Sequence, residues 1–143
     1  MASYVIALLF VLGPIADILT NVWPWQFGNE QWRFGLVGVA SNYLVSLIFG
    51  LLLWALVAAQ CEHRTALRVI TAVAAAGTLV LLVISVGFAL DTIQLRNFVR
   101  EEQRPLFKIG AVKTALKVLT SMLAMLLVAI GSFKAARHLG RGR

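Results

Sequence analysis

The chain has few of the residues that perform chemistry in proteins. Its single cysteine, Cys61, excludes an internal disulfide, and its two histidines, His63 and His138, belong to no H-E-x-x-H or Cys/His metal pattern. Asp and Glu together number only six, and no G-x-S-x-G motif or phosphate-binding glycine loop occurs. The sequence therefore predicts a protein that is not an enzyme and has no metal site. No cofactor is predicted either, although lipid or pigment could bind to helix surfaces.

Charge is scarce as well. Charged residues make up 13% of the 143-residue chain and hydrophobic residues make up 60%, whereas roughly a quarter of the residues in a soluble domain are charged. This composition predicts an integral membrane protein, with no nucleic acid among its partners.

Long apolar runs are what the sequence has in abundance. A helix needs about 20 apolar residues to cross about 30 Å of hydrocarbon, and four runs approach or exceed this length: residues 3–20, 34–59, 69–90 and 109–133. A basic tail follows at 134–143. Lipid admits only helices or closed barrels, and these runs are continuous rather than alternating. We therefore predict an all-α integral membrane four-helix bundle, a single domain of residues 1–143.

The connection between the first two runs is rich in aromatic residues. Pro24 ends the first helix, and Asn29 or Glu30 then caps the second one. Aromatic rings and snorkelling cations of this kind settle at the headgroup level of a membrane. The residues that we expect to contact lipid or a partner at this interface are Trp23, Trp25, Trp32 and Arg33.

The connection between the third and fourth runs carries Arg96, Arg100 and Arg104 at intervals of four residues. This spacing would keep the three arginines on one side of a helix. We expect the third helix to continue past the membrane, or a short amphipathic helix to lie on the membrane, until Pro105 stops it. The arginines would form a solvated face or contact a partner or a lipid headgroup.

The second run contains a stripe of small and polar residues with a strict spacing of four: Gly38, Asn42, Ser46 and Gly50. Small residues let helix backbones approach closely in lipid, where apolar attraction alone does not bring helices together. The stripe therefore predicts a helix-packing face. Asn42 would form a hydrogen bond across this face, and a ligand site at Asn42 is the alternative interpretation.

Asp17 is an ionisable residue within the first run, and such residues are costly in a membrane and often functional. Lys113 and Lys117, near the start of the fourth run, belong to the same side of the membrane. We therefore predict an intramembrane ion pair of Asp17 with Lys113, Lys117 or Arg33. A proton relay at Asp17 is the alternative, although no second intramembrane acid accompanies it.

The orientation of the chain is only weakly encoded. No cation precedes the first run and no A-x-A site follows it, so we expect a retained helix rather than a cleaved signal peptide. The first short connection carries one cation, Arg33, and the second carries two, Arg64 and Arg68. This difference favours termini in the cytoplasm.

The segment PIADILTNVWPWQFGNEQWRFG resembles small four-span bacterial membrane proteins to which no chemistry is assigned. The resemblance covers roughly residues 14–50 and rests on the W-P pair, the glycine four residues after Pro24, and W-R-F-G. It implies a four-span topology and a location in the bacterial inner membrane. It implies no functional site.

Two functions are compatible with these features. The first is a non-catalytic accessory or scaffolding subunit of a larger bacterial membrane complex, energy-transducing or photosynthetic, with membrane lipids and other membrane subunits as partners. The second is a small oligomeric transporter or channel in which Asp17, Asn42 and the two lysines line a path. A path requires a polar strip through the middle of the membrane, and the third run offers little of one.

Overall fold

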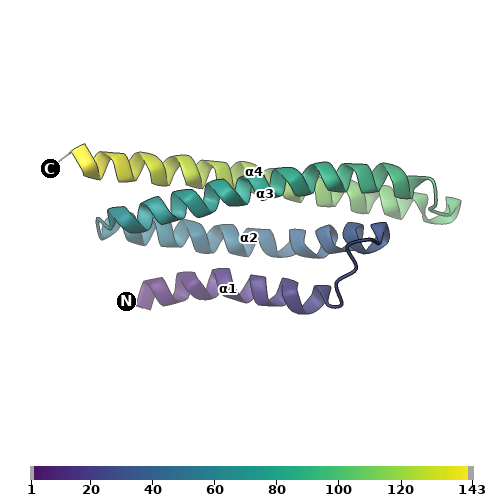
Figure 1. The fold of residues 1–143 in the computed structure, drawn as a ribbon, viewed down its shortest axis with the longest axis horizontal. Helices are drawn as coiled ribbons and strands as arrows, with labels where there is room; N and C mark the ends of the chain where they lie inside the picture. The colour runs from purple at the N-terminus through teal and green to yellow at the C-terminus, as the bar shows by residue number, and fades with distance from the viewer. Residues whose placement is uncertain (1, 142–143) are drawn as a thin grey trace.

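The computed structural model describes residues 2–141, which form long helices joined by short connections (Figure 1). The helices are α1 (Ala2–Val22), α2 (Glu30–Gln60), α3 (Arg64–Arg96) and α4 (Arg104–Arg141), and a single 3₁₀ turn, η1 (Glu101–Gln103), precedes α4. No strand occurs over the described range. The prediction of an all-α fold with four long helices is confirmed.

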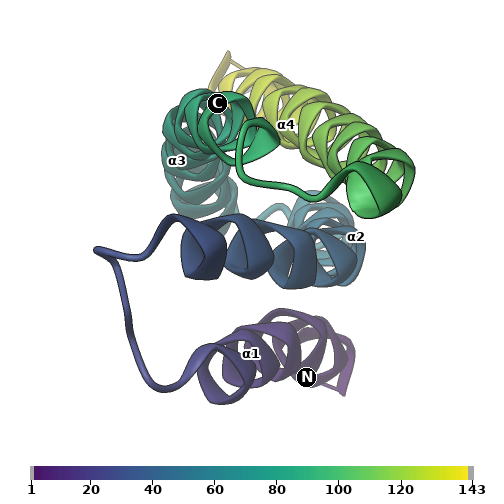
Figure 2. The same ribbon diagram turned by 90° about the vertical axis from the view of Figure 1, so that its right-hand side faces the viewer.

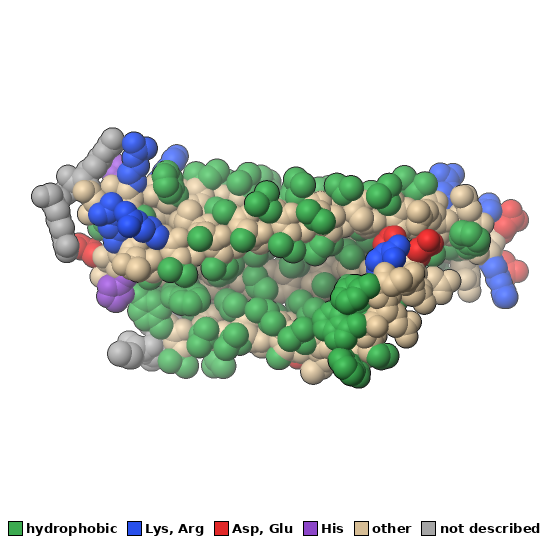
Figure 3. Space-filling view, in the orientation of Figure 1, with side chains coloured by type: hydrophobic (Ala, Val, Ile, Leu, Met, Phe, Trp, Pro, Cys, Tyr) green, Lys and Arg blue, Asp and Glu red, His purple; other side chains and the backbone are tan. Residues whose placement is uncertain are grey.

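All four helices are long and apolar enough to cross a membrane. Successive helices run in opposite directions, so the beginning of α1 and the end of α4 lie at the same end of the bundle (Figure 1). On the face shown in Figure 3, hydrophobic side chains cover the middle, and Lys and Arg gather toward the two ends. This distribution is compatible with a multi-pass membrane protein whose ends lie at the headgroups.

Each helix extends beyond the apolar run that predicts it. α2 begins four residues before the run at 34–59, and α4 begins five residues before the run at 109–133. The apolar run marks only the part of a helix that hydrocarbon surrounds, whereas the backbone hydrogen bonds continue into the headgroup region. The predicted basic tail is therefore helical as far as Arg141. Residues 142–143 of that tail lie outside the described range.

The connection between α3 and α4 follows the first of the two predicted alternatives in part. The third helix continues past its apolar run, but it ends at Arg96 and not at Pro105, and residues 97–103 contain no separate amphipathic helix. Residues 97–100 form a turn that leads into the three residues of η1. Pro105 stands in the first turn of α4 and does not end a helix, because the first amides of a helix have no partner within it.

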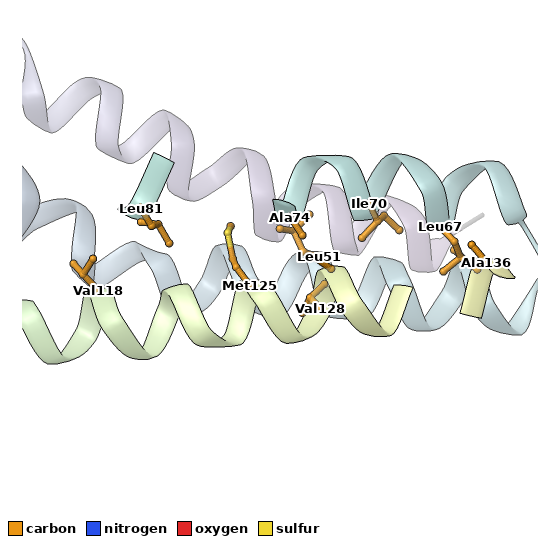
Figure 4. Close-up of a cluster of buried hydrophobic side chains, with 11 residues drawn as sticks. Leu51, Leu67, Ile70, Ala74, Leu81, Val118, Met125, Val128 and Ala136 are labelled. Carbon is orange, nitrogen blue, oxygen red and sulfur yellow. The ribbon is translucent and has the colours of Figure 1, made fainter. Parts of the chain in front are cut away.

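The helices α2, α3 and α4 pack around one core, and α1 lies against α2 at the edge of the bundle (Figure 2). Within residues 2–141, no other helix packs against α1. The buried hydrophobic cluster comes from α2, α3 and α4 alone (Figure 4). It consists of Leu51, Ala58, Leu67, Ile70, Ala74, Leu81, Val118, Met125, Val128, Ala129 and Ala136.

Buried positions on α3 and α4 recur every seven residues. Those on α3 are Leu67, Ala74, Leu81, Phe88 and Leu95, and those on α4 are Ala111, Val118, Met125 and Ser132. A sustained seven-residue repeat is typical of helices that pack as a left-handed coiled coil. The α3–α4 pair is thus the continuous seam of the bundle, and α2 packs against both of its helices.

The contact between α1 and α2 centres on Gly50. A Cβ added to Gly50 would lie 2.9 Å from the Cβ of Phe10 and 3.1 Å from the backbone oxygen of Ala7. Only a glycine therefore allows α1 to approach α2 this closely. At the end of α1 nearest the α2–α3 turn, the Tyr4 hydroxyl forms a 2.8 Å hydrogen bond with Nδ1 of His63.

Candidate functional site in the membrane-spanning region

The start of α2 fixes the position of the first cation in the spans. The Oδ1 of Asn29 accepts hydrogen bonds from the backbone N–H groups of Gln31 (2.9 Å) and Trp32 (3.2 Å). Asn29, and not Glu30, is therefore the N-cap. This cap places Arg33 at the first turn of α2, on the side of the bundle where α3 ends.

Arg33 forms an ion pair with Asp91 of α3. Its Nη2 and Nε donate to the two carboxylate oxygens of Asp91 at 2.7 Å and 3.1 Å, and its Nη1 donates to the backbone oxygen of Phe27 at 2.7 Å. Asp91 is only 6% exposed. Two parallel hydrogen bonds of this kind fix orientation as well as charge. The pair joins α2 to α3 and leaves no net charge.

Asp91 is a residue that the sequence analysis did not identify. The signal for it was present, because the start of the second run and the end of the third run must lie on the same side of a four-span protein. Arg33 and Asp91 flank these two ends. Because Arg33 pairs with Asp91, it does not pair with Asp17, for which it was one of three predicted partners.

The aromatic residues of this end form two groups. Phe34 stacks on Phe88 and on Phe107, with ring centroids 5.0 Å apart in each case. Trp25, Phe27 and Trp32 contact one another at centroid distances between 5.2 and 6.2 Å. Trp23 stands apart and is 72% exposed. The tryptophans thus lie at the end of the bundle, where a headgroup region would meet it.

The small and polar stripe of α2 does not form one packing face. Gly38 faces Thr114 of α4, Asn42 is exposed, Ser46 is half-buried, and Gly50 is buried against α1. The reason is geometric, because a step of four residues overshoots one helical turn by about 40°. Over twelve residues the stripe winds from the α4 side of α2 to its α1 side. It serves two neighbours rather than one.

Asn42 binds Lys117. The Nζ of Lys117 in α4 donates to the Oδ1 of Asn42 in α2, so Asn42 does bond across to another helix. Asn42 lies roughly 7 Å along α2 from the middle of the uncharged run at 34–59, at a rise of 1.5 Å per residue. Asn42 is exposed and Lys117 is half-buried. An ammonium group well inside the span thus has a neutral amide as its partner.

Asp17 does not form the predicted ion pair. Over residues 4–140, whose side chains the structure describes, the ion pairs are Arg33–Asp91 and Arg104–Glu101. The Asp17 side chain is exposed, and the hydrogen bonds at this residue reach its backbone oxygen, from Thr20 (3.1 Å) and Asn21 (2.8 Å). The physical reason is that α1 packs against α2 and does not reach α4, which carries both lysines. Lys113 is also exposed.

The register of α1 against α2 nevertheless brings Asp17 to the depth of Asn42. The rings of Phe10 and Phe49 are in edge contact, with centroids 5.5 Å apart. Asp17 follows Phe10 by seven residues, and Asn42 precedes Phe49 by seven. Two helical turns return a residue to nearly the same face, and α1 and α2 are antiparallel. Counting along the two helices thus places Asp17 and Asn42 at about the same depth of the α1–α2 pair.

We call Asp17, Asn42 and Lys117, which come from three helices and lie at about one depth of the span, the polar layer; its one contact is the hydrogen bond from Lys117 to Asn42. The hydroxyl groups of α3 beyond its first turn do not extend this layer. Each of these four donates to the backbone oxygen four residues earlier in its own helix, at 2.7 or 2.8 Å: Thr71, Thr78, Ser85 and Thr92. Because these groups are satisfied within the helix, they offer no polar strip to a solute.

The three arginines of the α3–α4 connection do not share a helix face, because α3 ends at Arg96 and Arg100 lies in the turn. Arg96 and Arg104 line one cavity together with Lys108, a cation that the sequence analysis did not single out. Arg100 does not line it. Arg104 lies 3.4 Å from the Glu101 carboxylate, and both side chains are largely exposed.

Among the residues that the structure describes, no three His, Cys, Asp or Glu side chains come together as a metal site would require. Cys61 is free and exposed. No protein-family model, no curated protein and no solved structure matches the chain. The resemblance of residues 14–50 to small four-span bacterial proteins therefore stays a prediction.

Proposed function

We propose that the protein is a non-catalytic accessory or scaffolding subunit of a larger assembly in the bacterial inner membrane, with its termini in the cytoplasm. An energy-transducing or photosynthetic complex is the kind of assembly that we expect. The observation that supports this proposal most is the polar layer, which lies at the surface of the single chain. It presents a lysine bound to a neutral amide and, at the same depth, an exposed aspartate.

The cost of placing charged side chains in a membrane favours a partner protein that covers this layer. A lysine or aspartate near the centre of a membrane helix costs about 2.5–3.5 kcal/mol on insertion scales. Snorkelling lowers this cost, but the Lys117 ammonium is engaged by Asn42 within the span. A neighbouring protein helix that covers the layer would shield the charges from hydrocarbon and provide further hydrogen bonds.

The isolated position of α1 supports the same proposal. Its outer face carries large hydrophobic side chains that are between 38% and 64% exposed, from Val5 to Leu19. Such a face can lie in lipid or against another subunit, and it needs no polar contact from either. The chain thus offers an apolar surface on α1 beside the polar layer.

The alternative is a small oligomeric transporter or channel, in which the polar layer would line the path. One observation favours it, namely that Asp17, Asn42 and Lys117 lie at one depth. The layer is only one residue deep on each helix, however, and the α3 hydroxyls are satisfied within α3. Elsewhere in the described range α2 and α4 bury only hydroxyl groups, those of Ser41, Thr114, Ser121 and Ser132. A path across the whole span would need more polar groups than these, so we prefer the subunit.

The test is the migration of a tagged chain in a native gel after extraction in mild detergent. We expect the wild-type chain to migrate with a much larger complex and the Lys117→Met chain to migrate alone. Lys134→Met is the matched control, because Lys134 is an exposed residue of α4 beyond the apolar run, and it should keep the large complex. A small complex of this chain alone, with a solute flux that Asp17→Asn abolishes, would overturn the proposal in favour of transport.

A further inference from the structure

Two hollows meet where α3 ends and α4 begins. The first is a cavity of about 320 Å³ lined by Ile93, Arg96, Asn97, Arg104, Phe107 and Lys108. The second is a groove of about 460 Å³ between α3 and α4, which is lined mainly by apolar side chains and shares Ile93 with the first. The two hollows are therefore neighbours along the α3–α4 seam.

The first hollow is strongly cationic. Three of its six lining residues are Arg96, Arg104 and Lys108, and none is acidic. Glu101 lies 3.4 Å from Arg104, but this exposed pair is weak. Arg96 and Lys108 pair with no acidic side chain in the described part of the chain. Arginine and lysine in this arrangement suit a phosphate group.

The depths of the two hollows differ in a way that fits one kind of ligand. Arg96 lies about 7.5 Å beyond Asp91 along α3, toward the end of the bundle, at a rise of 1.5 Å per residue. The groove extends in the opposite direction, about 12 Å from Ile93 to Ser85, into the apolar run. The cavity thus lies at the depth of the headgroups and the groove at the depth of the acyl chains.

We propose that this combined site binds an anionic phospholipid, with the phosphate among Arg96, Arg104 and Lys108 and one acyl chain in the groove. An amphiphile is the occupant that matches both hollows at once, because its charge and its hydrocarbon are joined at the membrane interface. A free phosphate would use the cavity and leave the groove unused. The proposal goes beyond the assembly role and does not depend on it.

The experiment uses the full chain in nanodiscs of phosphatidylcholine that contain a small fraction of phosphatidylglycerol. The chain is released into detergent, and the retained lipid is counted by native mass spectrometry. We expect wild type to retain phosphatidylglycerol at least tenfold over its fraction in the nanodisc. The double variant Arg96→Gln/Lys108→Gln should lose this enrichment. Arg100→Gln is the matched control, because Arg100 lies in the same connection but outside the cavity, and it should keep the enrichment.

Two further arms test the groove and the source of the phosphate. Ala115 lines the groove, so Ala115→Phe should fill it and reduce retention of the lipid while the cations remain. Inorganic phosphate at millimolar concentration should not displace the lipid from wild type. If Arg100→Gln lost the phosphatidylglycerol enrichment as fully as the double variant, the lipid would be held by general charge attraction and not by a site. If Ala115→Phe retained as much phosphatidylglycerol as wild type, no acyl chain would occupy the groove. Displacement by inorganic phosphate would point to a free anion site. Any of these three results overturns the proposal.

Discussion

Arg33 and Lys117 each bind a side chain of a neighbouring helix, and their surroundings are opposite. Arg33 lies near one end of the bundle and forms two hydrogen bonds with the buried carboxylate of Asp91. Lys117 lies deeper in the span and binds the neutral amide of Asn42, which is itself exposed. The first cation is neutralised within the chain. The second keeps its full charge.

This difference separates a contact that stabilises the single chain from a contact that is available to a partner protein. The Arg33–Asp91 pair is complete without a partner, because charge and hydrogen bonding are satisfied on both sides. The Lys117–Asn42 pair leaves a positive charge where lipid cannot compensate it. We therefore expect the end of the bundle to govern the stability of the single chain and the polar layer to govern its association.

The largest expected effect follows from Arg33→Met. The substitution leaves the buried carboxylate of Asp91 without its partner, and an uncompensated buried carboxylate costs about 3 kcal/mol or more. The free energy of unfolding should fall by that order when helicity is followed in mixed micelles with rising SDS. The swapped pair Arg33→Asp/Asp91→Arg should recover most of the loss. If Arg33→Met were as stable as wild type, the Arg33–Asp91 pair would not stabilise the single chain, and the contrast with Lys117 would fail.

The next effect concerns the helix that carries Asp17. In Gly50→Ala the new Cβ would meet Phe10 at 2.9 Å and the backbone oxygen of Ala7 at 3.1 Å, so α1 must move outward. Overpacking of this kind costs about 1–3 kcal/mol. The measurement is oxidative cross-linking in a chain that carries Cys61→Ser, Phe10→Cys and Phe49→Cys. Adding Gly50→Ala to this chain should sharply reduce the cross-link between α1 and α2.

Gly38→Ala is the matched control for that substitution, because a Cβ there meets its nearest neighbour, the Oγ1 of Thr114, at an ordinary 3.9 Å. Cross-linking should be unchanged in Gly38→Ala. The Arg33–Asp91 pair does not involve α1, so the SDS midpoint of Gly50→Ala should fall less than that of Arg33→Met. Equal falls would mean that α1 and the three-helix core unfold as one unit.

The helices were predictable because hydrocarbon thickness acts on single runs of residues. Four apolar runs gave four helices, and a cap at Asn29 was one of two expected positions. The helix ends were not predictable from apolarity, because a helix such as α4 continues through Lys134 and Arg137 once it leaves the hydrocarbon. The local rules thus fixed element type and number, and they left the boundaries open.

The contacts within the site were less predictable, because they depend on which helices become neighbours. Asp17 was predicted to pair with cations that belong to the same side of the membrane. However, α1 does not pack against α4, the helix that carries the two lysines. Asp91 was not predicted because it stands one residue beyond the apolar run at 69–90, where a charge is not unusual. The pairing of Lys117 with Asn42 requires α2 beside α4, which no pattern in either run specifies.

A smaller effect on stability is expected for Lys117→Met. Removing a charge that faces hydrocarbon should leave the single chain in micelles as stable as wild type or about 1 kcal/mol more stable, because the lost hydrogen bond and the removed charge offset each other. The measurement is again unfolding by SDS. Destabilisation as large as that of Arg33→Met would mean that Lys117 holds the fold together, and the contrast between the two cations would fail.

The smallest effect, and the most direct one, is the coupling between Asn42 and Lys117. A double-mutant cycle with Asn42→Leu and Lys117→Met isolates this pair, and intramembrane hydrogen bonds measured in this way average about 0.6 kcal/mol. The same cycle on Arg33 and Asp91, with Arg33→Met and Asp91→Leu, should give a clearly larger coupling, since two charges are joined there by two hydrogen bonds. If the Asn42–Lys117 coupling equalled it, the amide would satisfy the ammonium as fully as a carboxylate does. The polar layer would then need no partner, and the reason for placing a second subunit against it would be gone.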